Sequence, residues 1–248
     1  MRLRIKFSKL GKVRFVGHRD VARIMERALR RCGIPVTYSE GFSPRLRMSF
    51  GLALPTCYES EAEYLDVPLD PELVADGSII CTGWGQGKVY EQHQIQVALS
   101  RALPNGFDVV ALTVEPKGGG SLQEAVRSCG WTFDILGATP HQVEKTIQQA
   151  LNSSVIEVNR KKKNELVRED IRQGIHELRL NGESERGPVV IAELAAKPRV
   201  IRPSELIDVL APAAELGVAR RTHQWIEIDG QRTEPLMPST SLQPKEYP

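Results

Sequence analysis

The stretch Arg2-Leu3-Arg4-Ile5-Lys6-Phe7, near the start of the chain, alternates cationic and apolar side chains. Successive side chains of a β-strand point to opposite faces of a sheet, so this pattern predicts a strand with one apolar and one basic face. A strand of this kind fits an antiparallel sheet whose helices cover one side only.

A helix is predicted over residues 18–32, because apolar residues recur there at the helical period. An arc of about 80° on the opposite side of this helix holds four arginines, namely Arg19, Arg23, Arg27 and Arg30. Like charges on one stripe repel each other by roughly a few tenths of a kcal/mol per pair unless an anion binds them. The stripe is therefore a candidate anion-binding surface, and Gly33 and Pro35 are expected to end its helix.

The expected elements follow a similar order in the two halves of the chain. The first half shows strand patterns over 2–7, 34–38, 61–67 and 107–114 and helix patterns over 18–32 and 94–103. This order, β-α-β-β-α-β, is typical of the split βαβ arrangement of ferredoxin-like folds. The second half shows strand patterns over 131–136, 155–158, 175–180, 189–194 and 225–228 and helix patterns over 141–151 and 203–210. The sequence therefore predicts an α+β fold of two tandem ferredoxin-like units with antiparallel sheets.

The expected boundaries follow from composition. A link at 117–120, Lys-Gly-Gly-Gly, separates a basic N-terminal unit (1–116) from a C-terminal unit (121–232). The polar, proline-containing residues 233–248 are expected to form a tail. Residues 76–88 contain four glycines and are expected to form an inserted surface loop. A phosphate-binding loop is the alternative, but the segment contains neither GxGxxG nor GxxxxGK[ST].

Positive charge is concentrated at the start of the chain. Residues 1–50 contain 13 Lys and Arg and three acidic residues, a net charge of +10, whereas the whole chain carries +2. RNA or DNA is the candidate partner of such a segment, because each phosphate that a cation neutralises releases counterions. Lys161, Lys162 and Lys163 form a second basic patch in an expected hairpin turn. The alternative is a solvated basic face, or one that docks the acidic remainder of the chain.

Composition excludes several classes of protein. The 248 residues are 41% hydrophobic and 26% charged, which is enough to bury a core. No run approaches the roughly 18 uncharged apolar residues of a membrane helix, and the charged start MRLRIKF is unlike a secretory signal. The four cysteines form no CxxC pair and the histidines form no HExxH motif, so no disulfide framework and no metal site are predicted. We expect a cytoplasmic chain with no membrane partner.

One family resemblance covers most of the chain and is most specific in its first 70 residues. The run FSKLGKVRFVGHRDVARIMERALRRCGIPVTYSEGFSPRLRMSFGLALP (7–55), followed by ESEAEYLDV (59–67), resembles the radical-SAM-linked domain family of bacteria. The resemblance implies a radical SAM protein as partner, because members of that family are fused to such proteins or encoded beside them. It also implies work on RNA or the ribosome. The chain has no CxxxCxxC motif, so we expect it to hold no iron–sulfur cluster and no other cofactor.

Two classes of RNA enzyme built on paired ferredoxin-like units provide an alternative function. Pseudouridine synthases of the tRNA-modifying type need an aspartate in the loop after the second strand, whereas Glu40 is the only acid in loop 39–47 here. Metal-independent RNA endonucleases of the CRISPR type use a histidine as general acid and base, for which His18 is the candidate. A stand-alone RNA-modifying or RNA-cleaving enzyme would therefore rely on His18 and Glu40.

The leading hypothesis is a non-catalytic, RNA-binding accessory module that presents tRNA or rRNA to a radical SAM partner. Its expected phosphate contacts are Arg2, Arg4, Arg19, Arg23, Arg27, Arg30, Arg45, Arg47, Lys161, Lys162 and Lys163. Phe42, in a Gly-Phe-Ser-Pro loop, is the candidate residue for stacking on a base. A third hypothesis is a domain whose basic strip docks an acidic face of the radical SAM partner.

Overall fold

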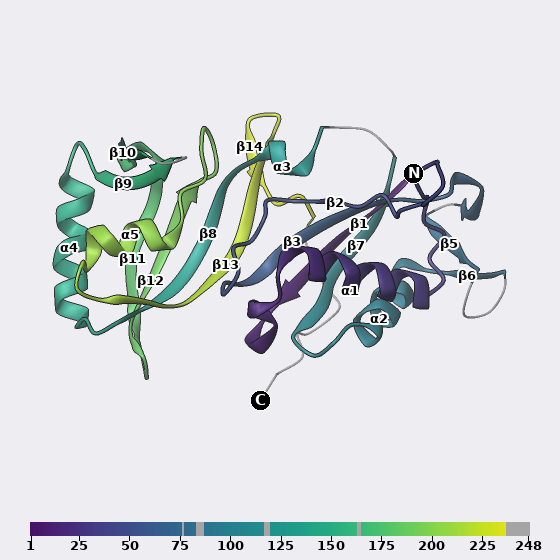
Figure 1. The fold of residues 1–248 in the computed structure, drawn as a ribbon, viewed down its shortest axis with the longest axis horizontal. Helices are drawn as coiled ribbons and strands as arrows, with labels where there is room; N and C mark the ends of the chain where they lie inside the picture. Colours follow the sequence, from purple (N-terminus) through teal and green to yellow (C-terminus); the bar gives the residue numbers. More distant parts are fainter. Residues whose placement is uncertain (76, 83–86, 117–119, 163–164, 237–248) are drawn as a thin grey trace. The chain divides into compact units, whose positions relative to one another are not determined.

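A computed structural model describes residues 1–75, 77–82, 87–116, 120–162 and 165–236 (Figure 1). The chain divides into unit 1, which holds Met1–Ala125 and, among the later described residues, 233–236, and unit 2, which holds Val126–Arg232. Of the predicted link at 117–120, only Gly120 lies within the described residues. Both units combine helices with antiparallel strand pairs, so the chain is an α+β protein with antiparallel sheets, as predicted.

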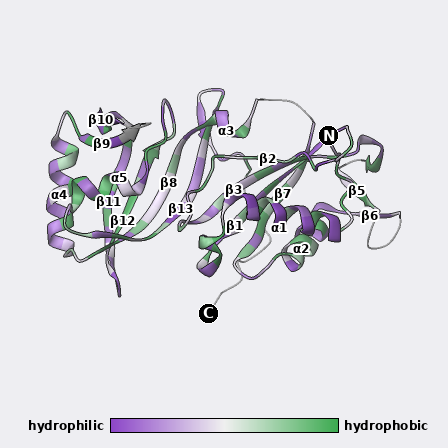
Figure 2. Ribbon diagram, in the orientation of Figure 1, coloured by the Kyte–Doolittle hydropathy of each residue, from purple (hydrophilic) through white to green (hydrophobic). Residues whose placement is uncertain are grey.

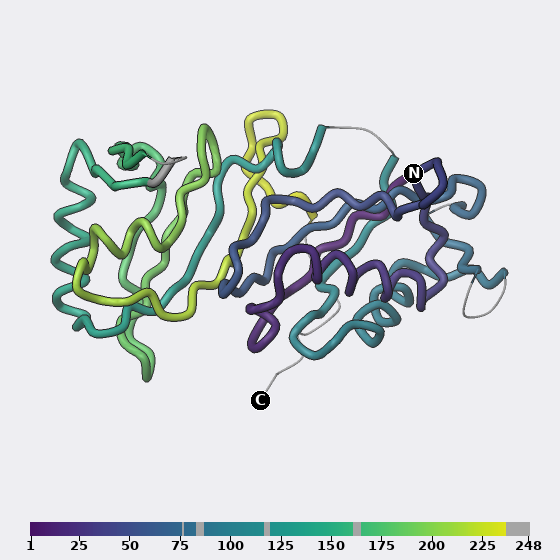
Figure 3. Tube along the Cα trace, in the orientation of Figure 1, coloured from purple at the N-terminus to yellow at the C-terminus, as the bar shows by residue number. Residues whose placement is uncertain are grey.

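The main sheet of unit 1 has the strand order β2-β3-β1-β7, and β1 runs antiparallel to both of its neighbours. The elements are β1 (Arg2–Lys9), η1 (Gly11–Phe15), α1 (His18–Arg31), β2 (Ser49–Phe50), β3 (Glu59–Pro68), α2 (Gln92–Ala102), β7 (Phe107–Glu115) and α3 (Leu122–Ala125). Figure 3 traces the path of the chain through them. The predicted strand at 34–38 is wrong, because only isolated bridges form there, at Val36 and Tyr38. Pro35 has no N–H to donate to a ladder, and the short β2 joins the sheet instead.

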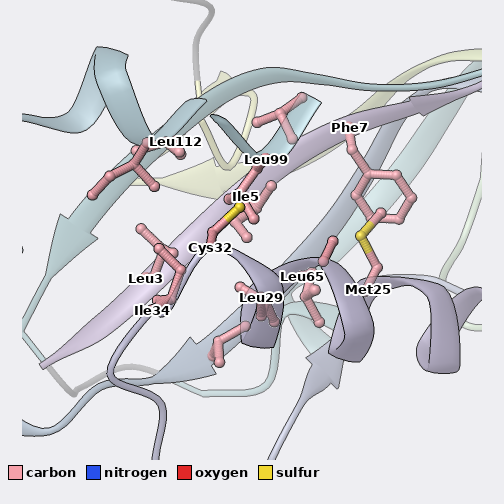
Figure 4. Close-up of a cluster of buried hydrophobic side chains, with 14 of the residues drawn as sticks. Leu3, Ile5, Phe7, Met25, Leu29, Cys32, Ile34, Leu65, Leu99 and Leu112 are labelled. Atoms are coloured by element: carbon pink, nitrogen blue, oxygen red, sulfur yellow. The ribbon is translucent and has the colours of Figure 1, made fainter. Parts of the chain in front are cut away.

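The apolar face of β1 lies at the centre of the core of unit 1 (Figure 4). Leu3, Ile5 and Phe7 are each at most 1% exposed, and they share one cluster with Met25 and Leu29 of α1. Burying a side chain of this size contributes about 1.5–3 kcal/mol. Hydrophilic and hydrophobic residues alternate along α1 in Figure 2, as expected of an amphipathic helix. The core therefore holds α1 against the sheet and leaves its arginine side facing away from it.

The C-terminal end of α1 is fixed by a glycine, as the sequence predicted. Gly33 has a φ of +64°, a conformation that residues with a side chain rarely adopt. The N–H of Ile34 donates to the carbonyl of Leu29 at 3.1 Å, and the N–H of Gly33 donates to that of Arg30 at 3.0 Å. These two bonds form a Schellman motif, which satisfies carbonyls that the helix end would otherwise leave unpaired.

The basic face of β1 is buried as well, which the sequence pattern did not predict. Arg4 is 7% exposed and Lys6 is 5% exposed. The Nζ of Lys6 donates to Glu234 Oε2 at 2.7 Å, and Arg4 donates to the carbonyl of Pro235 at 3.5 Å. The prediction of a tail is therefore wrong for residues 233–236, which pack into unit 1, while residues 237–248 lie outside the described residues.

The glycine-rich segment contains strands rather than only a surface loop. Three short strands, β4 (Val74–Ala75), β5 (Ser78–Cys81) and β6 (Lys88–Tyr90), form a separate antiparallel sheet. Ile79 is fully buried and Cys81 is 2% exposed, and both belong to the core cluster of unit 1. The prediction of a surface loop over 76–88 is thus wrong where the structure describes that segment. Ile79, Ile80 and Cys81 form an apolar run that signals a strand despite the surrounding glycines.

Unit 2 is built on a sheet with the strand order β11-β12-β8-β13. Its elements are β8 (Val126–Leu136), α4 (Pro140–Asn152), β9 (Glu157–Lys162), β10 (Glu165–Asp170), η3 (Arg172–Gly174), β11 (Ile175–Ser184), β12 (Gly187–Ala195), α5 (Pro203–Leu210), β13 (Glu215–Ile228) and β14 (Gln231–Thr233), which ends in unit 1. Each neighbouring pair in this sheet is antiparallel. β9 and β10 pair with each other in a separate two-stranded sheet, a hairpin inserted between α4 and β11.

Candidate nucleic-acid interface

The arginine stripe of α1 is exposed to solvent along its whole length. Arg19, Arg23, Arg27 and Arg30 are all exposed, and at a rise of 1.5 Å per residue they extend over about 16 Å of helix. Across residues 1–50, eight exposed side chains are cationic, whereas Asp20 and Glu40 are the exposed acids. The surface around α1 therefore keeps a strong positive charge.

Two of the four arginines have an acidic partner on the same helix. Arg23 lies 3.0 Å from the carboxylate three residues before it, and Arg30 lies 2.7 Å from the carboxylate four residues before it. Exposed pairs of this kind contribute about 0–1 kcal/mol, so a phosphate can replace the carboxylate at little cost. Within the described residues, neither Arg19 nor Arg27 lies in an ion pair. These two guanidinium groups are therefore the most available for an anion.

The loop after α1 is closed at its base and carries two of the predicted contact residues. Tyr38 and Leu46 form an antiparallel bridge. The N–H of Ser39 donates to the carbonyl of Arg45 at 2.8 Å, and the N–H of Arg45 donates back to Ser39 Oγ at 3.0 Å. These bonds fix the base of the loop, so that Phe42 lies at its tip and Arg45 on its exposed flank.

Phe42 is fully exposed to solvent. The φ of Gly41 is +118°, which favours glycine at that position, and Pro44 restricts the other side of the tip. An exposed phenylalanine forgoes about 1.5–3 kcal/mol that burial would supply. The ring therefore contributes little to the stability of unit 1 and is placed where a partner can contact it.

Two further exposed rings, which sequence reasoning missed, lie in the same segment. Phe15 is 57% exposed, and the guanidinium of Arg14 lies 4.6 Å from the centre of its ring. Tyr38 is 40% exposed, and the guanidinium of Arg30 lies 5.5 Å from the centre of its ring. The adjacency of Arg14 and Phe15 in the short segment between β1 and α1 is the signal in the sequence that could have indicated the first of these pairs.

Arg2 and Arg4 do not belong to the exposed surface, although both were predicted from the sequence to contact phosphates. Arg4 donates to both oxygens of Asp66 at 2.8 and 2.9 Å, and Arg2 donates to Glu115 Oε2 at 3.2 and 2.9 Å. Burial lowers the pKa of Arg4, whereas the hydrogen bond to Asp66 and the charge of Asp66 raise it. Together the raising effects are larger, so the net shift of the pKa is upward. Since these guanidinium groups already neutralise carboxylates, we assign them a structural role.

His18 and Glu40, the candidate catalytic residues, lie on different elements. His18 is the first residue of α1, and its ring packs edge-on against Phe50 of β2 at 4.8 Å between ring centres. Glu40 lies exposed in the loop. In the part of the chain that the structure describes, the two side chains share no hydrogen bond or ion pair. The contact that His18 does make is consistent with a packing role at the start of the helix.

The three predicted lysine contacts belong to unit 2. Lys161 and Lys162 lie on β9, where their backbone pairs with Leu166 and Glu165 of β10. Lys163 lies outside the described residues. Arg47, by contrast, lies in unit 1, is exposed, and follows the closed loop directly.

Neither a metal-binding cluster nor a membrane-spanning helix occurs in the described residues. No group of three or more His, Cys, Asp and Glu side chains among them is placed to hold a metal ion. Their helices are all too short or too polar to cross a membrane.

The fold and this surface define an α+β protein whose unit 1 presents arginines together with exposed aromatic rings. Residues 2–203 match the family described as "Uncharacterized protein conserved in bacteria (DUF2344)". Because the match covers most of the chain, the chain belongs to this family. The matched region includes the arginine stripe, the loop that carries Phe42 and most of unit 2. Comparison with curated proteins finds no match.

One solved structure similar to this chain is a "Crystal Structure of a Cbf5-Nop10-Gar1 Complex". The similarity covers 90% of this chain at 14% identity and a TM-score of 0.42. The chain spans about half of the length of that solved chain, 48%. A similarity at this TM-score carries neither fold nor function across to this protein.

Proposed function

We propose that this protein is a non-catalytic RNA-binding module that presents tRNA or rRNA to a radical SAM enzyme. The observation that carries the RNA part is the exposed arginine stripe of α1, in which Arg19 and Arg27 have no ion-pair partner within the described residues. Each phosphate that such a cation neutralises releases counterions, which is a large part of the affinity of proteins for nucleic acids.

The proposed phosphate contacts are exposed arginines of unit 1 that lie on α1 and in the segment after it. Four of the five arginines of α1 form one row, and the loop segment adds two more, so the set is Arg19, Arg23, Arg27, Arg30, Arg45 and Arg47. Arg2 and Arg4 are left out, because their charges are balanced by Asp66 and Glu115 inside unit 1. The sequence interpretation placed phosphates on β1 as well as on α1, the loop and the lysine patch, and the geometry favours α1 and the loop.

The radical SAM partner and the ferredoxin-like fold of both units are further parts of the proposal. The partner is supported by the resemblance of residues 7–67 to the radical-SAM-linked family. The fold is supported by strand order. In the sheet β2-β3-β1-β7, β1 comes first in the chain and lies between β3 and β7, and in the sheet β11-β12-β8-β13, β8 comes first and lies between β12 and β13. Each unit also has a helix after its first and its third strand. This is the order of the split βαβ arrangement.

A salt titration of RNA binding tests the proposal. The purified chain is mixed with total bacterial RNA at several salt concentrations, and the variant Arg19→Ala/Arg27→Ala is compared with wild type. Losing two phosphate contacts should weaken binding and reduce the slope of log K against log salt by about 1.4 for single strands. Arg168→Ala/Arg186→Ala removes the same charge from exposed positions in unit 2 and should leave the slope unchanged.

The same experiment separates the alternatives. An unchanged slope in the Arg19 and Arg27 variant would refute the assignment of phosphates to α1. Cleaved or modified RNA would instead favour an enzyme. Loss of that cleavage or modification in His18→Ala would identify His18 as the residue responsible. Capture of the radical SAM partner that withstands RNase, without RNA binding, would favour the protein-docking alternative.

A further inference from the structure

We propose that the RNA recognised by unit 1 is unpaired, and that its bases stack on the exposed aromatic rings beside the arginines. This inference rests on the proposed function and adds the class of RNA. It is carried by the rings, an observation independent of the charge. Arginines alone bind the phosphates of duplex and single-stranded RNA alike, whereas exposed rings need accessible base faces.

The exposed rings gather in one short part of the chain. Phe42 is fully exposed, Phe15 is 57% exposed and Tyr38 is 40% exposed. Among the described residues, no Phe, Tyr or Trp outside this set is as exposed. All three occur within the basic first 50 residues, so the exposed rings and the exposed arginines occupy the same segment.

Two of the rings lie next to a guanidinium group. Arg14 lies 4.6 Å from the centre of Phe15, and Arg30 lies 5.5 Å from the centre of Tyr38. The exposed Arg30 can meet a phosphate while a base stacks on the ring of Tyr38. Arg14 lies 3.6 Å from the carboxylate of Glu59, so its charge is already balanced and its part is to position the ring of Phe15. The pairing repeats near both ends of α1, which is the arrangement expected for a strand that follows the helix.

A duplex cannot use these rings. The bases of double-stranded RNA are stacked and paired, and its deep, narrow major groove excludes side chains. Phe42 protrudes at the tip of a loop that is closed by the bridge between Tyr38 and Leu46. A protruding ring of this kind can be covered by a base from an unpaired strand, loop or end, but finds no base face along a helix.

A cavity adjoining Arg47 provides room for an unpaired nucleotide. Its volume is about 570 Å³, within the range of pockets that hold small ligands. Arg47, Met48 and Ser49 form one wall directly after the loop, and Leu46 and Leu122 add apolar contact. The cavity is an open groove, and an unpaired nucleotide can lie in it beside Arg47.

The test compares one RNA sequence in two forms. A short fluorescent oligonucleotide without internal pairing is titrated with the full chain, both alone and annealed to its complement. Wild type should bind the single strand at least tenfold more tightly than the duplex. Phe42→Ala should weaken single-strand binding about tenfold, within the range that one stacked base contributes, with an unchanged salt slope. Phe42→Trp should retain the affinity.

A matched control is available in unit 2. Leu166 is 78% exposed, and Leu166→Ala removes an exposed apolar side chain without touching the proposed surface, so it should bind like wild type. Equal affinity for duplex and single strand, or a Phe42→Ala variant that binds like wild type, overturns the inference but leaves the proposed function standing. Absence of salt-dependent binding to either RNA overturns both.

Discussion

Residues 233–236 should stabilise unit 1 through a buried ion pair, and removing its acidic member tests this. The Nζ of Lys6 lies 2.7 Å from Glu234 Oε2, and the two side chains are 6% and 5% exposed. The hydroxyl of Tyr64 donates to the other oxygen at 3.3 Å. Glu234→Ala would leave Lys6 charged and buried without its partner. Breaking a buried pair in this way costs about 3–5 kcal/mol.

Urea unfolding followed by circular dichroism measures the effect. With an m-value of about 2 kcal/mol/M, a loss of about 4 kcal/mol lowers the midpoint for unit 1 by about 2 M. Removing both charges, as in Lys6→Met/Glu234→Leu, should restore most of the stability, because a buried pair is often replaced by apolar residues without loss. Glu227→Ala, at an exposed acid of unit 2, should stay within about 0.5 kcal/mol of wild type. A Glu234→Ala variant as stable as wild type would refute the reasoning.

Two further predictions concern titratable groups. Hydrogen bonds from the backbone N–H groups of Arg172 and Ile156 lower the pKa of Asp170 below its ordinary value, so its stabilising effect is present above pH about 4 and lost as pH falls through the native pKa. The difference in Tm between wild type and Asp170→Asn should therefore vanish in strong acid; a constant difference would contradict this. Burial raises the pKa of Cys32 to about 11, so at pH 8 a thiol reagent should modify the exposed Cys57 first, and equally rapid modification of Cys32 would contradict the packing.

The elements that carry the candidate site could be predicted from local pattern. The alternation in residues 2–7 and the helical period in 18–32 each place apolar residues on one face, and burial of that face decides the structure. The end of α1 was predictable as well, because Gly33 takes a left-handed conformation that few other residues tolerate. These features depend on neighbours within a few residues.

The burial and ion pairing of the basic face of β1 could not be predicted, because the acidic partners are distant in sequence. Lys6 pairs with a glutamate 228 positions away, and Arg4 with an aspartate 62 positions away. A strand that alternates Arg and Leu looks the same whether its cations meet solvent, phosphate or buried carboxylates. For the same reason, residues 233–236 were predicted from the sequence to belong to a tail.

The exposed positive charge of the candidate site could be predicted from the sequence, whereas the exposure of its aromatic rings could be predicted only in part. The arginines of α1 lie opposite its apolar face, so their exposure follows from the helical period. The exposure of Phe15 and Tyr38 depends on how η1 and the bridge at Tyr38 pack, which no local pattern specifies. Phe42 was identifiable because a glycine and a proline shape its loop.

Photo-crosslinking of bound RNA, with the attached peptides identified by mass spectrometry, tests the central claim most directly. Unit 1 is predicted to supply the crosslinks, from the loop that carries Phe42 and from the segment that holds Phe15 and Arg19. Recovery of those peptides with single-stranded RNA, and their loss in high salt, is the expected result. Crosslinks confined to unit 2, or none from residues 11–47, would contradict the account.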